Sequence, residues 1–194
     1  MLNLRKCGHK DLERYYSLLE MDFAKEEIIS KLSLHRALLN GSAELLVVYD
    51  EESNLEVAYA LVLTKNLYGY VLLKYMAVLP WYRGKGVGIA AMRLINKRYA
   101  DRQGIIAELT SFDDEDGSMI KGLRKFFARF GYVVVDSDYR IGGAPVELMV
   151  KPIKGTYEIE PVEHRIIRDF YTRVLNPFTM DKMIDIRPVK KQED

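Results

Sequence analysis

The sequence has 194 residues, a length that suits one domain of ordinary size. Hydrophobic residues make up 48% and charged residues 29%, which predicts a soluble protein with a substantial core. The net charge of +1 argues against a nucleic-acid-binding protein, because such proteins usually carry a clear basic excess. No apolar run approaches the roughly 18 residues of a membrane helix. The single cysteine, Cys7, allows no internal disulfide, so we expect a reduced, cytoplasmic setting.

The first half of the chain predicts two helices and a series of short strands. Helices are expected over residues 12–19 and 25–39, and strands over residues 2–6, 45–49, 57–63 and 70–79. Asn40-Gly41 predicts a left-handed end to the second helix. Pro80 closes the last of these strands, because proline removes a hydrogen-bond donor from the sheet.

The second half continues to alternate helices with strands. Helices are predicted over residues 88–99, 119–130 and about 163–175, and strands over residues 105–109, 132–135 and 146–150, with a turn at Gly142-Gly143. The acidic run 113–116 is expected to form a loop, and residues 190–194 are expected to be disordered. Consecutive hairpins that flank a β-α-β unit predict an α+β fold, a mixed sheet with helices packed on it.

The most informative stretch is the turn Arg83-Gly84-Lys85-Gly86-Val87-Gly88, between a predicted strand and a predicted helix. Its glycines lack Cβ atoms, so the backbone can approach a ligand closely and several N–H groups can point one way. The start of the helix adds the positive end of its dipole, and Arg83 and Lys85 add formal charge. Together these features predict an anion cradle suited to a pyrophosphate; a flexible turn without a ligand is the alternative.

The spacing excludes two common phosphate-binding turns. A dinucleotide-binding fold requires G-x-G-x-x-G, and a P-loop requires Gly-Lys-Ser/Thr, whereas Lys85 is followed here by Gly86. The pattern Arg-x-x-Gly-x-Gly after a strand instead resembles the acetyl-CoA motif of the GCN5-related N-acetyltransferase (GNAT) superfamily, with Arg83, Gly86 and Gly88 at its key positions. Residues 126–132, FFARFGY, resemble a second landmark of that family.

The resemblance covers about residues 1–152, and it implies a fold. We expect a GNAT-like central mixed, mostly antiparallel sheet with helices on both faces, splayed at the central parallel strands. The splay would lie between residues 75–78 and 105–109. Residues 153–194 lie outside the resemblance and are expected to form a C-terminal extension, helical in part, that packs on the domain or on a partner subunit.

The resemblance also implies a reaction, with acetyl-CoA as the cosubstrate and no metal. The pyrophosphate would lie on the turn amides, and the pantetheine arm would bind the backbone of the preceding strand. The acyl group would pass to a primary amine by direct attack in a ternary complex. An amine of pKa about 10.4 is mostly protonated at pH 7, so a base must remove its proton. The implied cofactor-binding residues are Met76, Ala77, Val78, Arg83, Gly84, Lys85, Gly86, Val87 and Gly88.

The proton chemistry departs from the family pattern at two places. Many members carry a glutamate near residues 72–74, where this chain has none, and a tyrosine acid where this chain has Phe127. Glu108, a carboxylate in an otherwise apolar strand, is the candidate catalytic base or amine anchor, and a salt-bridged structural carboxylate is the alternative. Tyr75, Tyr132 and Tyr139 are candidates for the vacant acid role.

Two functions therefore stay open. The first is an acyl-CoA-dependent N-acyltransferase, and the second is a CoA-binding module or sensor with little or no transferase activity. We expect an amine-bearing acceptor, no nucleic-acid or membrane partner, and a monomer or homodimer. The acidic residues 113–116 either attract a cationic substrate or form a solvated loop. The three histidines have no zinc-like spacing, so no metal site is predicted.

Overall fold

The computed structural model describes residues 1–110, 117–135, 137–154 and 163–187 of the chain. The acidic run 113–116 and the terminal residues 190–194, for which the sequence predicts a loop and disorder, lie outside the described residues. None of the helices in the described ranges has the length and apolar character that a membrane crossing requires.

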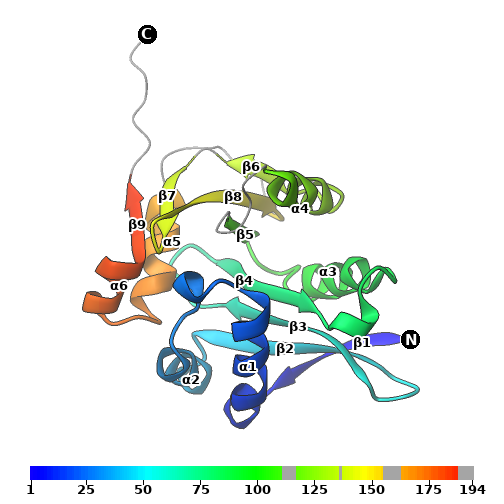
Figure 1. Ribbon diagram of the computed structural model, residues 1–194. Coiled ribbons are helices and arrows are strands. Elements are labelled where there is room, and N and C mark those ends of the chain that lie inside the picture. The colour runs from blue at the N-terminus through cyan, green and yellow to red at the C-terminus, as the bar shows by residue number, and fades with distance from the viewer. Residues whose placement is uncertain (111–116, 136, 155–162, 188–194) are drawn as a thin grey trace.

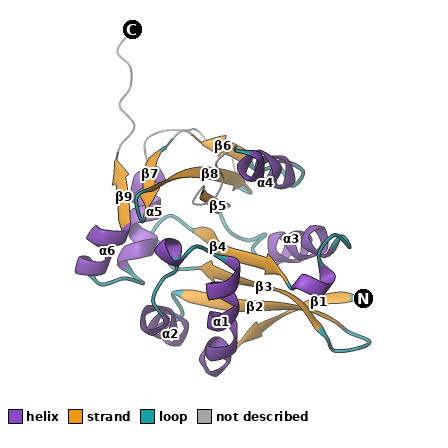
Figure 2. Cartoon of the chain, viewed as in Figure 1, coloured by secondary structure: helices purple, strands orange, loops and turns teal. Residues whose placement is uncertain are grey.

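Helices and strands occur in the order predicted, with additions near the C-terminus (Figures 1 and 2). The strands are β1 Leu2–Cys7, β2 Ala43–Asp50, β3 Glu56–Leu63, β4 Tyr70–Val78, β5 Gly104–Thr110, β6 Val133–Val135, β7 Asp138–Ile141, β8 Ala144–Pro152 and β9 Ile184–Arg187. The α-helices are α1 Leu12–Asp22, α2 Lys31–Asn40, α3 Val87–Arg98, α4 Ser118–Ala128, α5 Glu163–Thr172 and α6 Pro177–Met183. Short 3-10 turns occupy His9–Asp11, Lys25–Glu27 and Pro80–Tyr82.

The strands form a mixed sheet in the order β1-β2-β3-β4-β5-β8-β7-β9, with β6 also paired to β8. The pair β4–β5 is parallel, and the other pairs among the described strands are antiparallel. Parallel pairing extends from Tyr70↔Gly104 only to Leu73↔Ala107, and beyond it β4 and β5 separate. The expected splay is therefore present, but it begins at Lys74 and Glu108, because residues 105–107 are still paired.

Helices cover both faces of the sheet, as the sequence predicts (Figure 1). On one face, α1, α2, α5 and α6 pack against alternate strand residues such as Tyr59; the helices contribute Leu19, Leu34, Phe170 and Met180, respectively. On the other face, α3 and α4 pack through residues such as Ile95 against the intervening strand residues. This division follows from strand geometry, since successive side chains of a strand point to opposite faces.

The predicted helix over 25–39 is interrupted, and this break matters for the site. Residues 25–27 form a 3-10 turn, residues 28–30 belong to no helix or strand, and α2 begins only at Lys31. The Ser30 side chain accepts a hydrogen bond from the Ser33 N–H and so caps α2 at its start. At the other end, Gly41 has φ 74° and ends the helix in the left-handed conformation, as predicted.

The C-terminal segment joins the same sheet and core as the rest of the chain. α5 buries Ile166, Ile167 and Phe170 against the first face of the sheet. Strand β9 pairs with β7, from Asp138↔Arg187 to Ile141↔Ile184. The sequence predicts the α5 helix but misses α6, β7 and β9, because short elements give only weak periodicity.

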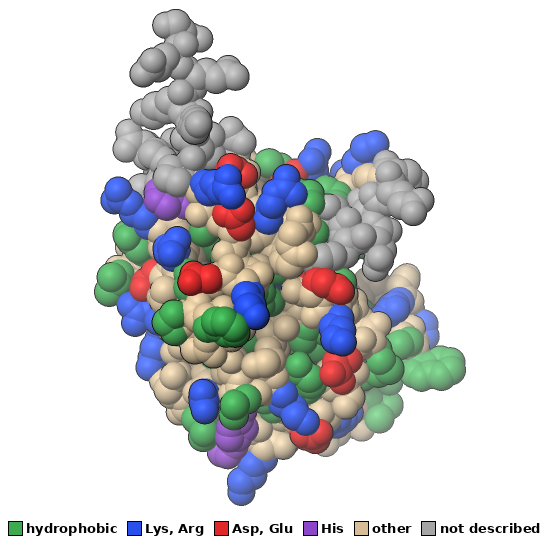
Figure 3. All heavy atoms as spheres, turned by 60° about the vertical axis from the view of Figure 1, so that its left-hand side comes forward, with side chains coloured by type: hydrophobic (Ala, Val, Ile, Leu, Met, Phe, Trp, Pro, Cys, Tyr) green, Lys and Arg blue, Asp and Glu red, His purple; other side chains and the backbone are tan. Residues whose placement is uncertain are grey.

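The surface carries charges of both signs. On the face that Figure 3 shows, lysine and arginine side chains are interspersed with aspartate and glutamate side chains. This distribution agrees with the near-neutral composition of the chain.

Candidate functional site

The glycine turn connects the end of β4 to the start of α3. Pro80–Tyr82 form a 3-10 turn, and α3 begins at Val87 with Gly86 as its N-terminal cap. Gly84 and Gly86 both adopt positive φ, 74° and 79°, which side chains other than glycine rarely adopt. A Cβ at either position would have no neighbour within 4 Å among the described residues, so both glycines border open space.

The start of α3 presents free backbone donors to this space. The Gly86 carbonyl accepts hydrogen bonds from the Ile89 and Ala90 N–H groups, which are the first donors to bond within the helix. The N–H groups that come before these two in the first turn have no partner carbonyl within the helix, because no helical turn precedes them. Together with the helix dipole, they would favour an anion at this point, and the anion cradle stays a prediction from the sequence.

The Arg83 side chain bonds to two elements beside the turn. Its Nε donates to the Val78 carbonyl at 2.9 Å, and its Nη2 lies 2.6 Å from Asp22 Oδ1 at the end of α1. The second carboxylate oxygen of Asp22 accepts a hydrogen bond from the Tyr59 hydroxyl at 2.9 Å. Arg83 therefore fixes the position of the turn relative to α1, with its side chain still half exposed.

The last residues of β4 have one open edge. The Leu79 N–H donates to the Val57 carbonyl on the β3 side. Backbone groups alternate between the two edges of a strand, so Ala77 also faces β3, while Met76 and Val78 face the side where β5 has departed. Of the three residues expected to bind a pantetheine arm, Met76 and Val78 present their backbone groups to the splay.

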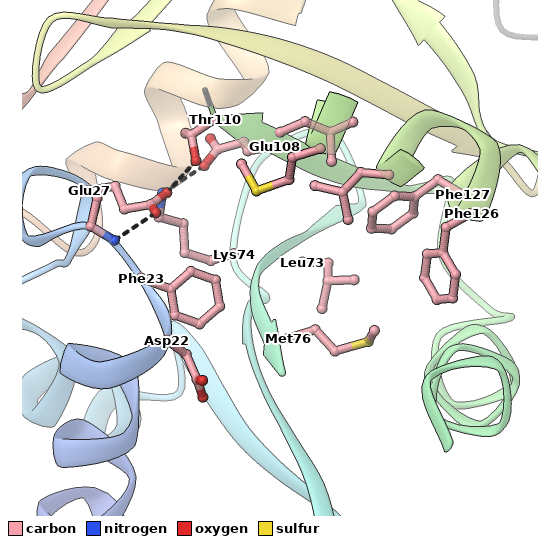
Figure 4. Close-up of a pocket in the computed structure, with 14 residues that line it drawn as sticks. Asp22, Phe23, Glu27, Leu73, Lys74, Met76, Glu108, Thr110, Phe126 and Phe127 are labelled. Atoms are coloured by element: carbon pink, nitrogen blue, oxygen red, sulfur yellow. Dashed lines mark hydrogen bonds and ion pairs between the residues drawn. The ribbon is translucent and has the colours of Figure 1, made fainter. Parts of the chain in front are cut away.

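A cavity of ≈ 240 Å³ occupies the mouth of the splay (Figure 4). Its wall combines Lys74 and Met76 of β4 with Glu108 and Thr110 of β5. In Figure 4, charged and polar side chains lie at one end of the cavity, whereas Phe126 and Phe127 lie at the other end. The complete lining is Asp22, Phe23, Ala24, Glu27, Leu73, Lys74, Met76, Glu108, Leu109, Thr110, Met119, Leu123, Phe126 and Phe127.

Glu108, the candidate base, lies at this cavity, but its carboxylate already has an ion-pair partner and hydrogen-bond donors. Its Oε2 lies 2.8 Å from Lys74 Nζ, and both side chains are only 1% exposed. The hydroxyls of Tyr139 and Tyr171 donate to the same carboxylate, each at 2.8 Å. A carboxylate with an ion pair and two hydroxyl donors has little capacity left to accept a substrate proton. The catalytic role of Glu108 therefore stays a prediction that this geometry does not favour.

Glu27 lies on the same cavity, and sequence reasoning did not single it out. Its Oε2 accepts a hydrogen bond from the Thr110 hydroxyl at 2.7 Å, and its Oε1 accepts one from the Ala24 N–H at 3.2 Å. The residue is 8% exposed. The sequence signal was hidden, because residues 25–39 suggested one helix on which Glu27 would be an ordinary surface position.

Three tyrosines were candidates for a proton donor, and none of them lines the cavity. The Tyr75 hydroxyl donates to the Glu27 carbonyl and accepts from the Ile29 N–H, so it fastens the segment before α2 to β4. The Tyr132 hydroxyl donates to Asn96, and the Tyr139 hydroxyl donates to Glu108. Burial raises the pKa of all three hydroxyls, which makes them weaker acids than an exposed tyrosine.

Phe127 occupies the position at which the family resemblance leads one to expect a tyrosine. The ring is 6% exposed and lies in the core between α4 and the sheet, 5.1 Å from the Tyr132 ring centroid. It also contributes to the apolar end of the cavity. Phe127 has no proton to donate, so it acts by packing.

Residues 41–134 match the family model described as an acetyltransferase (GNAT) domain. This range contains the glycine turn, the splayed strands and the FFARFGY segment. The family match identifies residues 41–134 as a GNAT acetyltransferase domain, and the fold of the described chain agrees with the resemblance. Comparison with curated protein sequences finds no match.

Solved structures with the same fold are similar in architecture and distant in sequence. A putative GNAT-family acetyltransferase from Bacteroides thetaiotaomicron aligns with a TM-score of 0.68 at 18% identity, over 88% of this chain and 96% of that one. NAA60 from Arabidopsis thaliana, in complex with acetyl-CoA, gives 0.59 at 15% identity over 80% and 100%. A spermidine N-acetyltransferase from Vibrio cholerae gives 0.60 at 13% identity over 78% and 94%.

Proposed function

We propose that this protein transfers an acetyl group from acetyl-CoA to a primary amine, by direct attack in a ternary complex. One observation carries the proposal: the open edge of β4 leads directly into a glycine turn and the start of α3, and a cavity lies at the same splay. A long ligand with an anionic end and an amide-bearing arm fits this continuous path.

Each part of this path binds a different part of acetyl-CoA. The pyrophosphate lies on the amides from Arg83 to Gly88, where positive φ at Gly84 and Gly86 and the helix dipole favour an anion. The pantetheine amides bond to the backbone of Met76 and Val78, as an added strand would. Ala77 then contributes backbone packing, since its polar groups face β3.

The reactive end of the ligand then lies in the cavity. The Val78 N–H faces the splay and is a suitable donor to the thioester oxygen, where negative charge develops during attack. Phe126 and Phe127 supply the apolar end of the cavity and keep water from the thioester. The amine approaches from the polar end, beneath the segment before α2.

Turnover of acetyl-CoA by a panel of amines tests the proposal. Release of free CoA is measured with polyamines, aminoglycosides, amino acids and peptide N-termini as acceptors. The V. cholerae neighbour acts on spermidine, so this polyamine belongs in the panel. Amine-dependent CoA release supports the proposal, and tight CoA binding without turnover on any amine would refute it.

A CoA-binding module or sensor is the second candidate, because Phe127 removes the usual proton donor. The same panel separates the two functions, since a sensor binds CoA tightly and releases none of it from acetyl-CoA. Solvent at the cavity mouth can protonate the departing thiolate, so the missing tyrosine does not by itself exclude turnover.

A further inference from the structure

The charges around the cavity do not balance. Three carboxylates line it, from Asp22, Glu27 and Glu108. Asp22 is paired with Arg83 at 2.6 Å, and Glu108 is paired with Lys74 at 2.8 Å. No basic side chain of the described residues lies within 4.0 Å of the Glu27 carboxylate. The polar end of the cavity therefore has one excess negative charge, on Glu27.

The environment of Glu27 makes this charge costly unless a ligand balances it. The residue is more than nine-tenths buried, and the two hydrogen bonds of its carboxylate come from neutral donors, the Thr110 hydroxyl and the Ala24 N–H. A buried carboxylate is stabilised mainly by a cation or by further donors. Both of its present partners are donors, which is the arrangement that an ionised carboxylate requires.

The position of Glu27 is also tightly fixed. The Tyr75 hydroxyl bridges the Glu27 carbonyl and the Ile29 N–H, at 2.8 and 2.9 Å, so the 3-10 turn is held against β4. Thr110 lies on β5, beyond the point where the two strands part. Thr110 of β5 therefore holds the carboxylate, and Tyr75 of β4 holds the backbone that carries it; Glu27 lies at the polar end of the cavity in Figure 4.

Resting on the acetyltransferase function proposed above, we infer that Glu27 binds the ammonium of the acceptor and takes its proton. We further infer the class of acceptor: an alkylammonium with no carboxylate on the carbon that bears the nitrogen. The excess negative charge on Glu27 favours a cation at this end of the cavity, and an α-carboxylate beside the ammonium would meet like charge. Polyamines and peptide N-termini satisfy this condition, and free amino acids do not.

The proton transfers balance in this scheme. The ammonium gives one proton to the Glu27 carboxylate, and the neutral amine attacks the thioester carbon. As the C–N bond forms, the π electron pair of the carbonyl moves to its oxygen. The carbonyl then re-forms as the C–S bond breaks, and the departing thiolate takes the second proton from the nitrogen. The products are the amide and free CoA, and protonated Glu27 then returns its proton to solvent.

Glu27→Gln tests the role of the charge, because glutamine removes the charge and keeps the shape of the side chain. We expect kcat/KM for the best amine of the panel to fall about 100-fold or more, because general-base contributions have this size. Glu26→Gln is the matched control, since Glu26 is in the same turn and exposed, and the same charge is removed. CoA affinity by calorimetry should be unchanged in both variants, which shows that both are folded.

Binding of small probes tests the inference without turnover. The CoA-loaded protein is titrated by NMR with n-butylamine, with norvaline, which adds an α-carboxylate, and with the neutral n-butanol. We expect n-butylamine to bind at least tenfold more tightly than the other two, and Glu27→Gln to remove this preference.

The outcomes separate this inference from the proposed function. If the wild type turns over amines and Glu27→Gln does so equally well, Glu27 is not the anchor and the acetyltransferase function stands. If the wild type turns over no amine, the proposed function fails, and the n-butylamine titration alone decides whether Glu27 binds an ammonium. Binding of norvaline as tight as that of n-butylamine would overturn the acceptor class.

Discussion

The ammonium of Lys74 lies 2.8 Å from the carboxylate of Glu108, at the point where β4 and β5 part. The pair is buried, and two tyrosine hydroxyls from β7 and α5 complete the coordination of the carboxylate. At the point where the two strands begin to separate, an ion pair rather than apolar packing thus links them. Tyr171 also links this ion pair to the C-terminal segment.

Lys74→Met should destabilise the protein by about 3–5 kcal/mol, because it leaves the Glu108 charge buried without a cation. The double change Lys74→Met with Glu108→Leu should cost clearly less, since it removes both charges. Urea unfolding at pH 7 measures both free energies. Equal losses in the single and double variants would show that packing, and not the ion pair, holds the base of the splay.

Gly86→Glu should abolish CoA binding, because it places a side chain and a negative charge in the proposed anion cradle. Gly131→Glu is the matched control: Gly131 also has positive φ, at 82°, and a Cβ there meets no described atom within 4 Å. Backbone strain and added charge are then common to both variants. Calorimetry with CoA should show lost affinity only for Gly86→Glu, and equal affinities in the two variants would contradict the cradle assignment.

Gly104→Ala should destabilise the fold at the start of the parallel pair. A Cβ there would lie 2.6 Å from Tyr70 Cε1 and 2.8 Å from the Lys151 carbonyl oxygen, so the sheet must shift. We expect a loss of about 1–3 kcal/mol in the free energy of unfolding. Gly122→Ala is the control, because Gly122 is exposed within α4 with open space around it, and the change should stabilise the protein by about 0.5–1 kcal/mol.

Glu44→Gln should reduce stability at neutral pH and have little effect in acid. Burial alone would raise the pKa of the Glu44 carboxyl, but hydrogen bonds from Tyr99, Lys6 and Arg98 outweigh it and lower the pKa below its ordinary value. A folded-state pKa below the unfolded one adds stability above the unfolded value of about 4.3, and this stability is lost as the pH falls through the folded pKa. Thermal unfolding from pH 7 to pH 3 should show the two proteins converge, and a constant difference would contradict this origin.

The sequence by itself identified the glycine turn and the order of the main elements. Both are local properties: glycine spacing sets which backbone conformations are open, and the period of apolar residues sets helix or strand. The sequence also marked Glu108 as anomalous, since a charge in an apolar strand requires a partner. It could not name Lys74, Tyr139 and Tyr171 as those partners, because they are 34, 31 and 63 residues away along the chain.

Only the tertiary structure shows which carboxylate of the cavity has no basic partner among the described residues. Glu27 reaches the cavity because the predicted helix over 25–39 is interrupted, and the break is held by the Tyr75 hydroxyl of β4. Its own partner, Thr110, is 83 residues further along the chain. Contacts over such separations depend on how the sheet and helices pack, which no local pattern of residues specifies. For the same reason, the sequence was enough to predict the cofactor turn, whereas the proposal for the amine site required the fold.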